Sequence, residues 1–94
     1  MALARVVQFD GVGKDRMAEM QKNMDEGERP EGLDATEILV LHDADADQAL
    51  AIVFFDNEDD YERGDKILSA MPAGDTPGQR TSVKKYQVAV RRTP

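Results

Sequence analysis

One side chain in this sequence suits acid–base chemistry near neutral pH, and it is His42, the only histidine among 94 residues. Because the ordinary pKa of histidine lies near neutrality, His42 is the candidate general acid or base. A histidine at the end of a strand also often has a structural role, so both interpretations stay open. The chain has no cysteine, and one histidine alone does not make a histidine-rich transition-metal site. The sequence therefore predicts neither a metal centre nor a cofactor.

The candidate ligand-binding side chains are methionines and tyrosines. Met17, Met20 and Met24 recur at i, i+3 and i+7, which builds one apolar stripe along a helix. Methionine repacks easily, so this stripe either lines an adaptable pocket or fills the core. The hydroxyls of Tyr61 and Tyr86 either orient a phenolic or quinone-like ligand or sit at the rim of a packed core. The predicted ligand-binding set is Met20, Met24, Tyr61 and Tyr86. The expected site is a cleft between sheet and helices, where Tyr61 supplies one polar group and His42 or Tyr86 supplies another if its strand face turns inward.

An acidic run and a lone arginine are the other unusual features. The aspartates at 43, 45 and 47 are spaced as in a calcium loop, but the sixth position is not glycine and the twelfth is Phe54. The run therefore predicts a solvated turn. Arg5 lies in a strand-like segment, where a charge needs a partner. Glu37 or a bound anion could provide one, and we expect an ion pair at a subunit interface.

Six segments must position these side chains. Strand-like sequence covers residues 3–9, 36–43, 48–55 and 81–92, and helical sequence covers residues 14–26 and 57–71. The order βαββαβ is the ferredoxin-like plan, an α+β fold with a four-stranded antiparallel sheet in the order 4-1-3-2. In this plan both helices pack on one face of the sheet. All 94 residues are expected to form a single domain.

Two local signals mark the second helix. Asn57 is a good N-cap, and Asp60 follows three residues later as in a capping box. Gly64 falls inside the helix, where glycine costs about 1 kcal/mol relative to alanine. We therefore expect Gly64 to let this helix lie close to the sheet.

The segment 48–55 is apolar on both faces of the predicted strand, unlike a half-solvated strand. With helices on one face, a second copy of the chain is the simplest cover for the other, since C2 dimers are the commonest homo-oligomers. The net charge of −7 argues against general nucleic-acid binding. The sequence shows neither a membrane-spanning apolar run nor a signal-peptide pattern. These features predict a cytoplasmic homodimer.

A family resemblance rests on two runs, AIVFFDN at residues 51–57 and PGQRTSV at residues 77–83. With the element order, they resemble the antibiotic-biosynthesis-monooxygenase-like proteins of the dimeric α/β-barrel superfamily. The resemblance implies two ferredoxin-like subunits whose sheets together form a barrel with the helices outside. Members include cofactor-free oxygenases, haem-degrading enzymes, isomerases and many proteins of unknown activity.

The resemblance supplies no catalytic residue. Haem-degrading and quinone-forming members typically use combinations of Asn, Trp and His, whereas this chain has no Trp and no Asn in its first strand. Whether the chain is an enzyme of oxygenase-like or isomerase-like type is left open. Two functions follow as alternatives. In the first, a small hydrophobic or aromatic ligand is bound or oxidised in the cleft between sheet and helices. In the second, the protein is a non-catalytic structural or interaction dimer.

Overall fold

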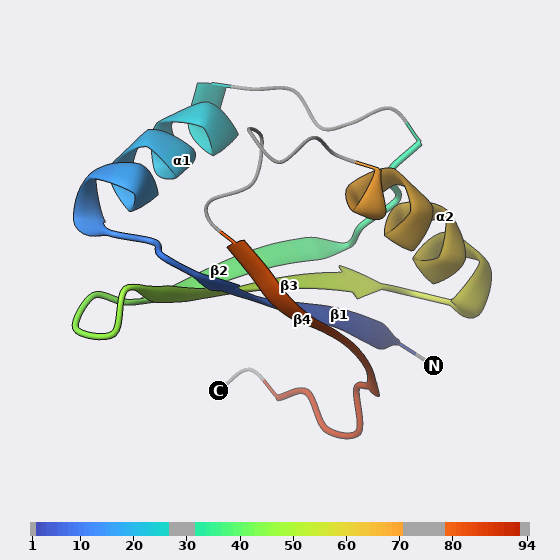
Figure 1. The fold of residues 1–94 in the computed structure, drawn as a ribbon. Helices are drawn as coiled ribbons and strands as arrows, with labels where there is room; N and C mark the ends of the chain where they lie inside the picture. The colour runs from blue at the N-terminus through green and yellow to red at the C-terminus, as the bar shows by residue number, and fades with distance from the viewer. Residues whose placement is uncertain (1, 27–31, 71–78, 93–94) are drawn as a thin grey trace.

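The computed structural model describes residues 2–26, 32–70 and 79–92, which form one sheet and two helices. The elements are β1 (Leu3–Asp10), α1 (Lys14–Glu26), β2 (Glu37–Asp43), β3 (Gln48–Phe55), α2 (Glu58–Ser69) and β4 (Gln79–Gln87). Both helices lie on the same side of the sheet (Figure 1). The chain is therefore a small α+β fold, consistent with the ferredoxin-like plan.

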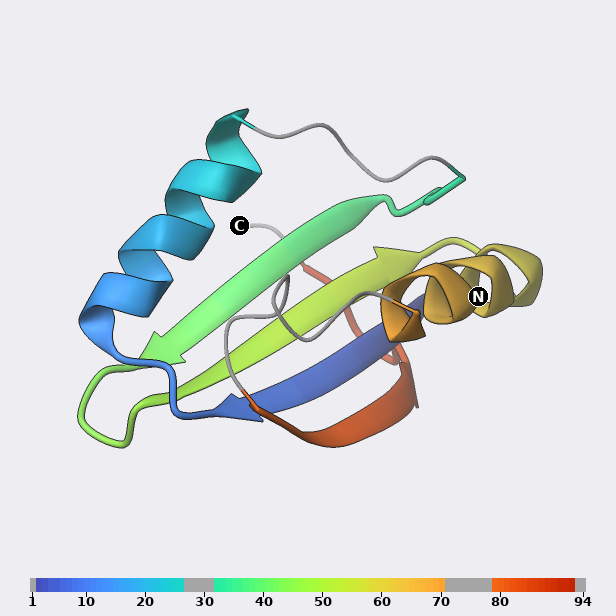
Figure 2. The same cartoon turned by 45° about the horizontal axis from the view of Figure 1, so that its top comes forward.

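The sheet has four strands in the order β2-β3-β1-β4, and every neighbouring pair is antiparallel. Read from the β4 edge, this is the order 4-1-3-2 that the sequence pattern predicts. Figure 2 shows the sheet with α1 beside β2, and with α2 folded back over the start of β1 next to the end of β3. The strand pairs β1–β3 and β2–β3 are in continuous register, whereas β1–β4 has an irregularity between Gln8 and Phe9.

The start of α2 forms as its sequence predicts. The Asn57 side chain accepts a hydrogen bond from the Asp60 backbone N–H at 2.9 Å, and its amide group donates to the Asp60 carboxylate at 3.1 Å. The first of these bonds satisfies a backbone N–H that the first helical turn would otherwise leave without a partner. The predicted N-cap is confirmed.

Two clusters of buried side chains fill the space between sheet and helices. The cluster under α2 contains Leu3, Leu33, Ala35, Val53, Phe55 and Tyr61. The cluster under α1 contains Val7, Phe9, Val12, Met17 and Ala49. On the helix-facing side of β1, the buried Arg5 lies between Leu3 of one cluster and Val7 of the other. The core is therefore divided by a charged side chain.

Gly64 brings α2 close to β3. A Cβ atom built on Gly64 would lie 2.3 and 2.4 Å from two ring atoms of Phe55, and 3.2 Å from a methyl carbon of Leu33. The Phe55 side chain is completely buried. The predicted close approach at Gly64 is confirmed, since any larger residue would displace a packed ring.

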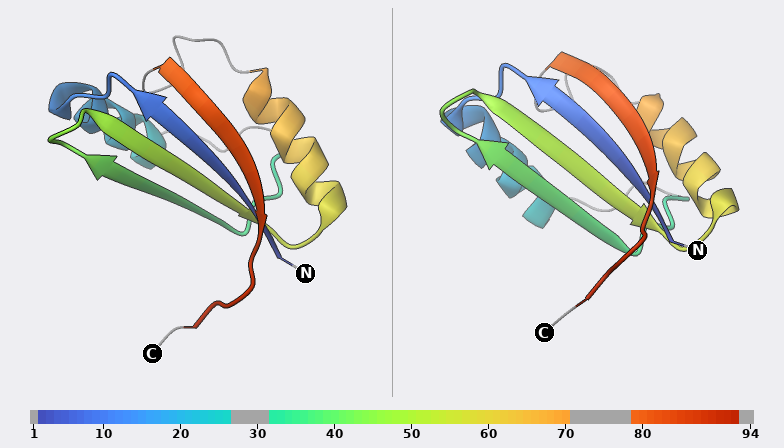
Figure 3. Two further views of the ribbon diagram at one scale, coloured as in Figure 1. Left: turned by 60° about the horizontal axis from the view of Figure 1, so that its bottom comes forward. Right: turned by 90° about the horizontal axis from the view of Figure 1, so that it is seen from below.

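The sheet face turned away from the helices is open (Figure 3). We call it the open face, and its central positions follow from strand register: Leu39 and Leu41 of β2, Leu50, Ile52 and Phe54 of β3, Val6 and Gln8 of β1, and Lys84 and Tyr86 of β4. Leu39, Leu41 and Tyr86 are 43, 47 and 49% exposed. Six of these nine residues are aliphatic or phenylalanine, so the open face is mainly apolar.

Candidate functional site

The predicted tyrosine of the cleft, Tyr61, is packed into the cluster under α2. Its ring meets Phe55 edge-on, with centroids 5.6 Å apart and planes at 72°. The Lys85 ammonium group lies 4.8 Å from the Tyr61 ring centroid, and it also pairs with the Glu58 carboxylate. Burial, followed by the negative charge of Asp65, raises the pKa of the Tyr61 hydroxyl. Tyr61 therefore stays protonated at neutral pH and contributes to packing.

The other predicted ligand-binding residues are not gathered around Tyr61. Met20 is partly buried and packs against the cluster under α1, next to the buried Met17. The side chain of Met24 lies outside the described residues. Tyr86 is on the open face, because its neighbour Lys85 is the β4 residue that turns toward α2. The sheet therefore separates Tyr86 from Tyr61 and Met20.

His42 connects the end of β2 to the chain that leads into α1. Its Nε2 atom lies 2.8 Å from the backbone carbonyl oxygen of Val12. A carbonyl oxygen only accepts hydrogen bonds, so this contact assigns the proton to Nε2. Val12 itself is completely buried. This hydrogen bond gives His42 a structural role and occupies its Nε2 atom, the nitrogen that points toward the buried Val12.

The predicted partner of Arg5 is wrong. The Arg5 Nε atom donates to the Asp65 carboxylate at 2.8 Å, and Nη2 donates to the Ser69 hydroxyl at 3.2 Å. The guanidinium is therefore held by α2 of the same chain. Glu37, the expected partner, lies on the open face of β2 and pairs with Arg91 of the C-terminal segment. Because Arg5 shares the helix-facing side of β1 with Leu3, it points away from Glu37.

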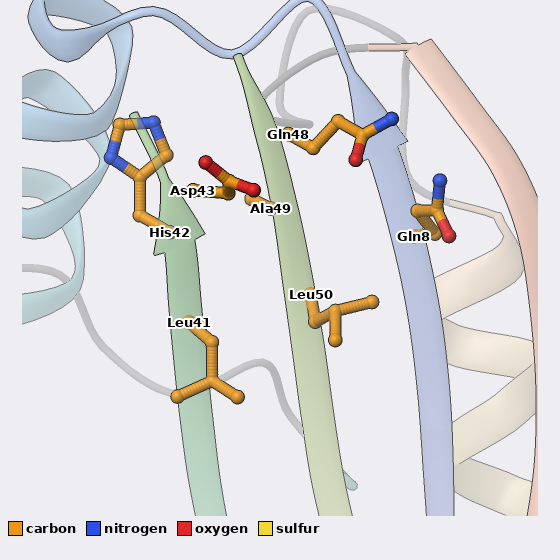
Figure 4. Close-up of a pocket in the computed structure, with 7 residues that line it drawn as sticks. All are labelled: Gln8, Leu41, His42, Asp43, Gln48, Ala49 and Leu50. Carbon is orange, nitrogen blue, oxygen red and sulfur yellow. The ribbon is translucent and has the colours of Figure 1, made fainter. Parts of the chain in front are cut away.

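A hollow of about 260 Å³ lies at the end of the sheet where β2 turns into β3. Its lining residues are Gln8, Leu41, His42, Asp43, Gln48, Ala49 and Leu50. Figure 4 shows the Leu41 and Leu50 side chains on neighbouring strands, the Gln48 side chain extending from β3 toward β1, and the His42 ring beside α1. Most of the hollow therefore belongs to the open face, away from the predicted cleft.

Strand register explains the composition of the hollow. Gln8, Leu50 and Leu41 occupy one row across β1, β3 and β2. Asp10, Gln48 and Asp43 occupy the next row, nearer the β2–β3 turn. Sequence reasoning missed this site because each strand alternates correctly on its own, and only the pairing between strands places these side chains together.

Residues 2–26, 32–70 and 79–92 contain neither a metal-binding cluster nor a membrane-spanning helix. No group of three or more acidic or histidine side chains there is arranged to hold a metal ion. No helix in the same ranges is both long enough and apolar enough to cross a membrane. Among the described residues, the open face and its hollow are therefore the candidate interaction and binding sites.

Neither a protein-family model, nor a curated protein, nor a solved structure matches this chain. The resemblance to the monooxygenase-like dimeric α/β barrels accordingly stays a prediction. Function has to be inferred from the geometry of the described residues.

Proposed function

We propose that this chain is a non-catalytic interaction protein that works as a homodimer closed over the open faces of two sheets. One observation carries the proposal. Leu39, Leu41 and Tyr86 are 43, 47 and 49% exposed on one continuous face that also contains Ile52 and Phe54. Contiguous exposed apolar surface of this kind marks an interaction site.

The physical reason is the layering of the fold. A sheet is stable when its apolar face is buried against another layer, and α1 and α2 supply that layer on one side only. A second copy offers the same apolar face to the first, so one isologous contact covers both. The dimeric α/β-barrel arrangement implied by the family resemblance is a contact between sheets, which supports this choice of partner.

The side chains suited to chemistry support a non-catalytic role. Nε2 of His42 is engaged by the Val12 carbonyl oxygen, and the buried Arg5 is engaged by Asp65. Tyr61 is packed against Phe55. Within the described ranges His42 lies apart from Arg5 and Tyr61, and each of the three is held by its own neighbours, whereas catalysis requires a base and a polarising group aimed at one reacting atom.

Light scattering coupled to size exclusion tests the dimer. Wild type is expected at twice the chain mass of 10.4 kDa. Leu39→Glu places a charge on the open face, at the middle of its edge strand β2, and should give a folded monomer by circular dichroism. Ala18→Glu adds the same charge at an exposed position of α1 and should remain a dimer. A wild-type mass of one chain, unchanged from micromolar to millimolar concentration, would refute the proposal.

A second candidate function is the binding of a small molecule, and the hollow of about 260 Å³ favours it. Ligand sites are concave and mostly apolar, with a few placed polar groups. The hollow combines the leucines at 41 and 50 with the amides at 8 and 48. The predicted cleft between sheet and helices remains an alternative location, for which Met20 and Tyr61 supply the apolar wall.

A further inference from the structure

We propose that the hollow binds a small organic cation with an apolar body, such as an arylalkyl ammonium ion. The inference rests on the second candidate function and names its ligand class. The lining residues come from β1, β2 and β3 of one chain. The site is therefore complete within one subunit. Because Leu41 and Leu50 also belong to the open face, a bound ligand competes with a second copy of the chain for these two leucines.

The apolar part of the ligand is set by Leu41 and Leu50. They are neighbours across β2 and β3, and Leu41 is 47% exposed. A volume of about 260 Å³ suits a single ring or a short chain and is smaller than the pockets that hold drug-sized ligands. Contact with these two leucines removes apolar surface from water on both the protein and the ligand.

The row of residues nearer the β2–β3 turn determines which ligand charge the hollow favours. Asp10 and Asp43 flank Gln48 there, and the turn that follows adds Asp45 and Asp47. None of these four carboxylates forms an ion pair with a cation in the described parts of the chain. Asp10 accepts a hydrogen bond from the Gln8 amide, and Asp43 accepts two from turn backbone N–H groups. Asp43 is the one of these four carboxylates that lines the hollow, and no ion pair among the described residues offsets its charge, which favours cations.

The spacing of the carboxylates favours an organic cation over a metal ion. Asp10 and Asp43 are on β1 and β2, with β3 between them, and neighbouring strands are about 4.8 Å apart. The backbones that carry them are thus about 10 Å apart, whereas a calcium ion needs oxygens within about 2.6 Å. In keeping with this, no metal-binding group of three is found among the described residues. An ammonium group between them can instead donate to the oxygens of Gln8, Gln48 and one carboxylate.

The test is a titration of ¹⁵N-labelled wild-type protein with three probes of one size: 2-phenylethylammonium, 2-phenylethanol and phenylacetate. The cation is expected to shift the amide signals of residues 8, 41–43 and 48–50. Its affinity should exceed that of the alcohol about tenfold or more, as a charged hydrogen bond provides. Phenylacetate should leave these signals unchanged. Equal binding of all three probes, or no shift at these residues, would overturn the inference.

A matched pair of variants separates the hollow from the general acidity of the protein. Asp43→Asn removes one charge at the hollow and keeps the side-chain oxygen that accepts from the turn. It should weaken cation binding several-fold. Asp59→Asn removes the same charge at an exposed site of α2 and should change nothing. Equal weakening by both variants would mean diffuse attraction and would overturn the site. A monomeric wild type that still binds the cation would refute only the dimer.

Discussion

Replacing Gly64 by alanine sets two opposing effects against each other. Alanine is the better helix former by about 1 kcal/mol, so an exposed position would gain stability. At Gly64 the new methyl group would lie 2.3 and 2.4 Å from the Phe55 ring, well inside contact distance. Phe55 is completely buried, and its ring is held edge-on by Tyr61. The ring cannot swing into solvent, so either α2 lifts or the ring moves against its neighbours.

The size of the loss follows from these contacts. Overpacking a core costs about 1–3 kcal/mol, and a disturbed aromatic pair forfeits about 0.5–1.5 kcal/mol more. Subtracting the gain in helix propensity of about 1 kcal/mol leaves an expected net loss of about 0.5–3.5 kcal/mol for Gly64→Ala. For a domain of this size, each kcal/mol lost should lower the melting temperature by about 4–8 °C.

Urea unfolding followed by circular dichroism measures this loss, with Gly13→Ala as the control. Gly13 has no atom within 4 Å of a built Cβ, so the same substitution there should change stability by about 0.5 kcal/mol or less. Phe55→Leu removes the ring edge, so in that background Gly64→Ala should cost less than in wild type. Stabilisation by Gly64→Ala, or strictly additive effects with Phe55→Leu, would refute the close-approach argument.

Two further outcomes follow from the charges around α2. Asp65→Asn should destabilise the protein by about 1–3 kcal/mol in urea melts, because it leaves the buried Arg5 without its carboxylate. The control is Glu62→Gln, at an exposed position of the same helix, which should have little effect. Equal losses in the two variants would contradict a stabilising role for the Arg5–Asp65 pair. The raised pKa of Tyr61 means that the folded state holds this proton more tightly than the unfolded state, whose tyrosine titrates at about pH 10. The stability that Tyr61 contributes should therefore be fully present below pH 10 and be lost as the pH rises above 10. Above pH 10, Tyr61→Phe should lose less stability than wild type. Tyr86→Phe, at the exposed tyrosine, should follow wild type, and an unchanged alkaline loss in Tyr61→Phe would assign it to other groups.

The elements of the fold were accessible from the sequence because they depend on local signals. Period-two and helical patterns predict all six elements, and Asn57 marks the start of α2 correctly. The last strand is the main difference, since it was expected to reach residue 92 and ends at Gln87. The reason is its partner: β1 begins at Leu3, so after one more bond, from the Val88 N–H to the Ala2 carbonyl, β4 has no strand to pair with.

The candidate site was less accessible because it depends on contacts between distant residues. Arg5 and Asp65 are 60 positions apart, and their meeting depends on how α2 is rotated over β1. The sequence leaves open whether Tyr86 lies in the cleft, because alternation within β4 does not say which face turns toward the helices. That face is fixed only when Lys85 is found opposite Arg5. The hollow needs the register of three strands at once, which no single segment encodes.

The charged side chain that divides the core has a consequence for how the molecule opens. Arg5 separates the apolar cluster under α2 from the cluster under α1, so the two helices share the sheet as a support while each has its own set of buried contacts. A fluctuation that releases Met17 and frees α1 breaks none of the contacts that Tyr61 and Phe55 make. Local opening of α1 is therefore a partial unfolding event with its own free energy, below that of the whole domain. In evolutionary terms, each helix can accumulate substitutions against its own cluster while the other stays packed.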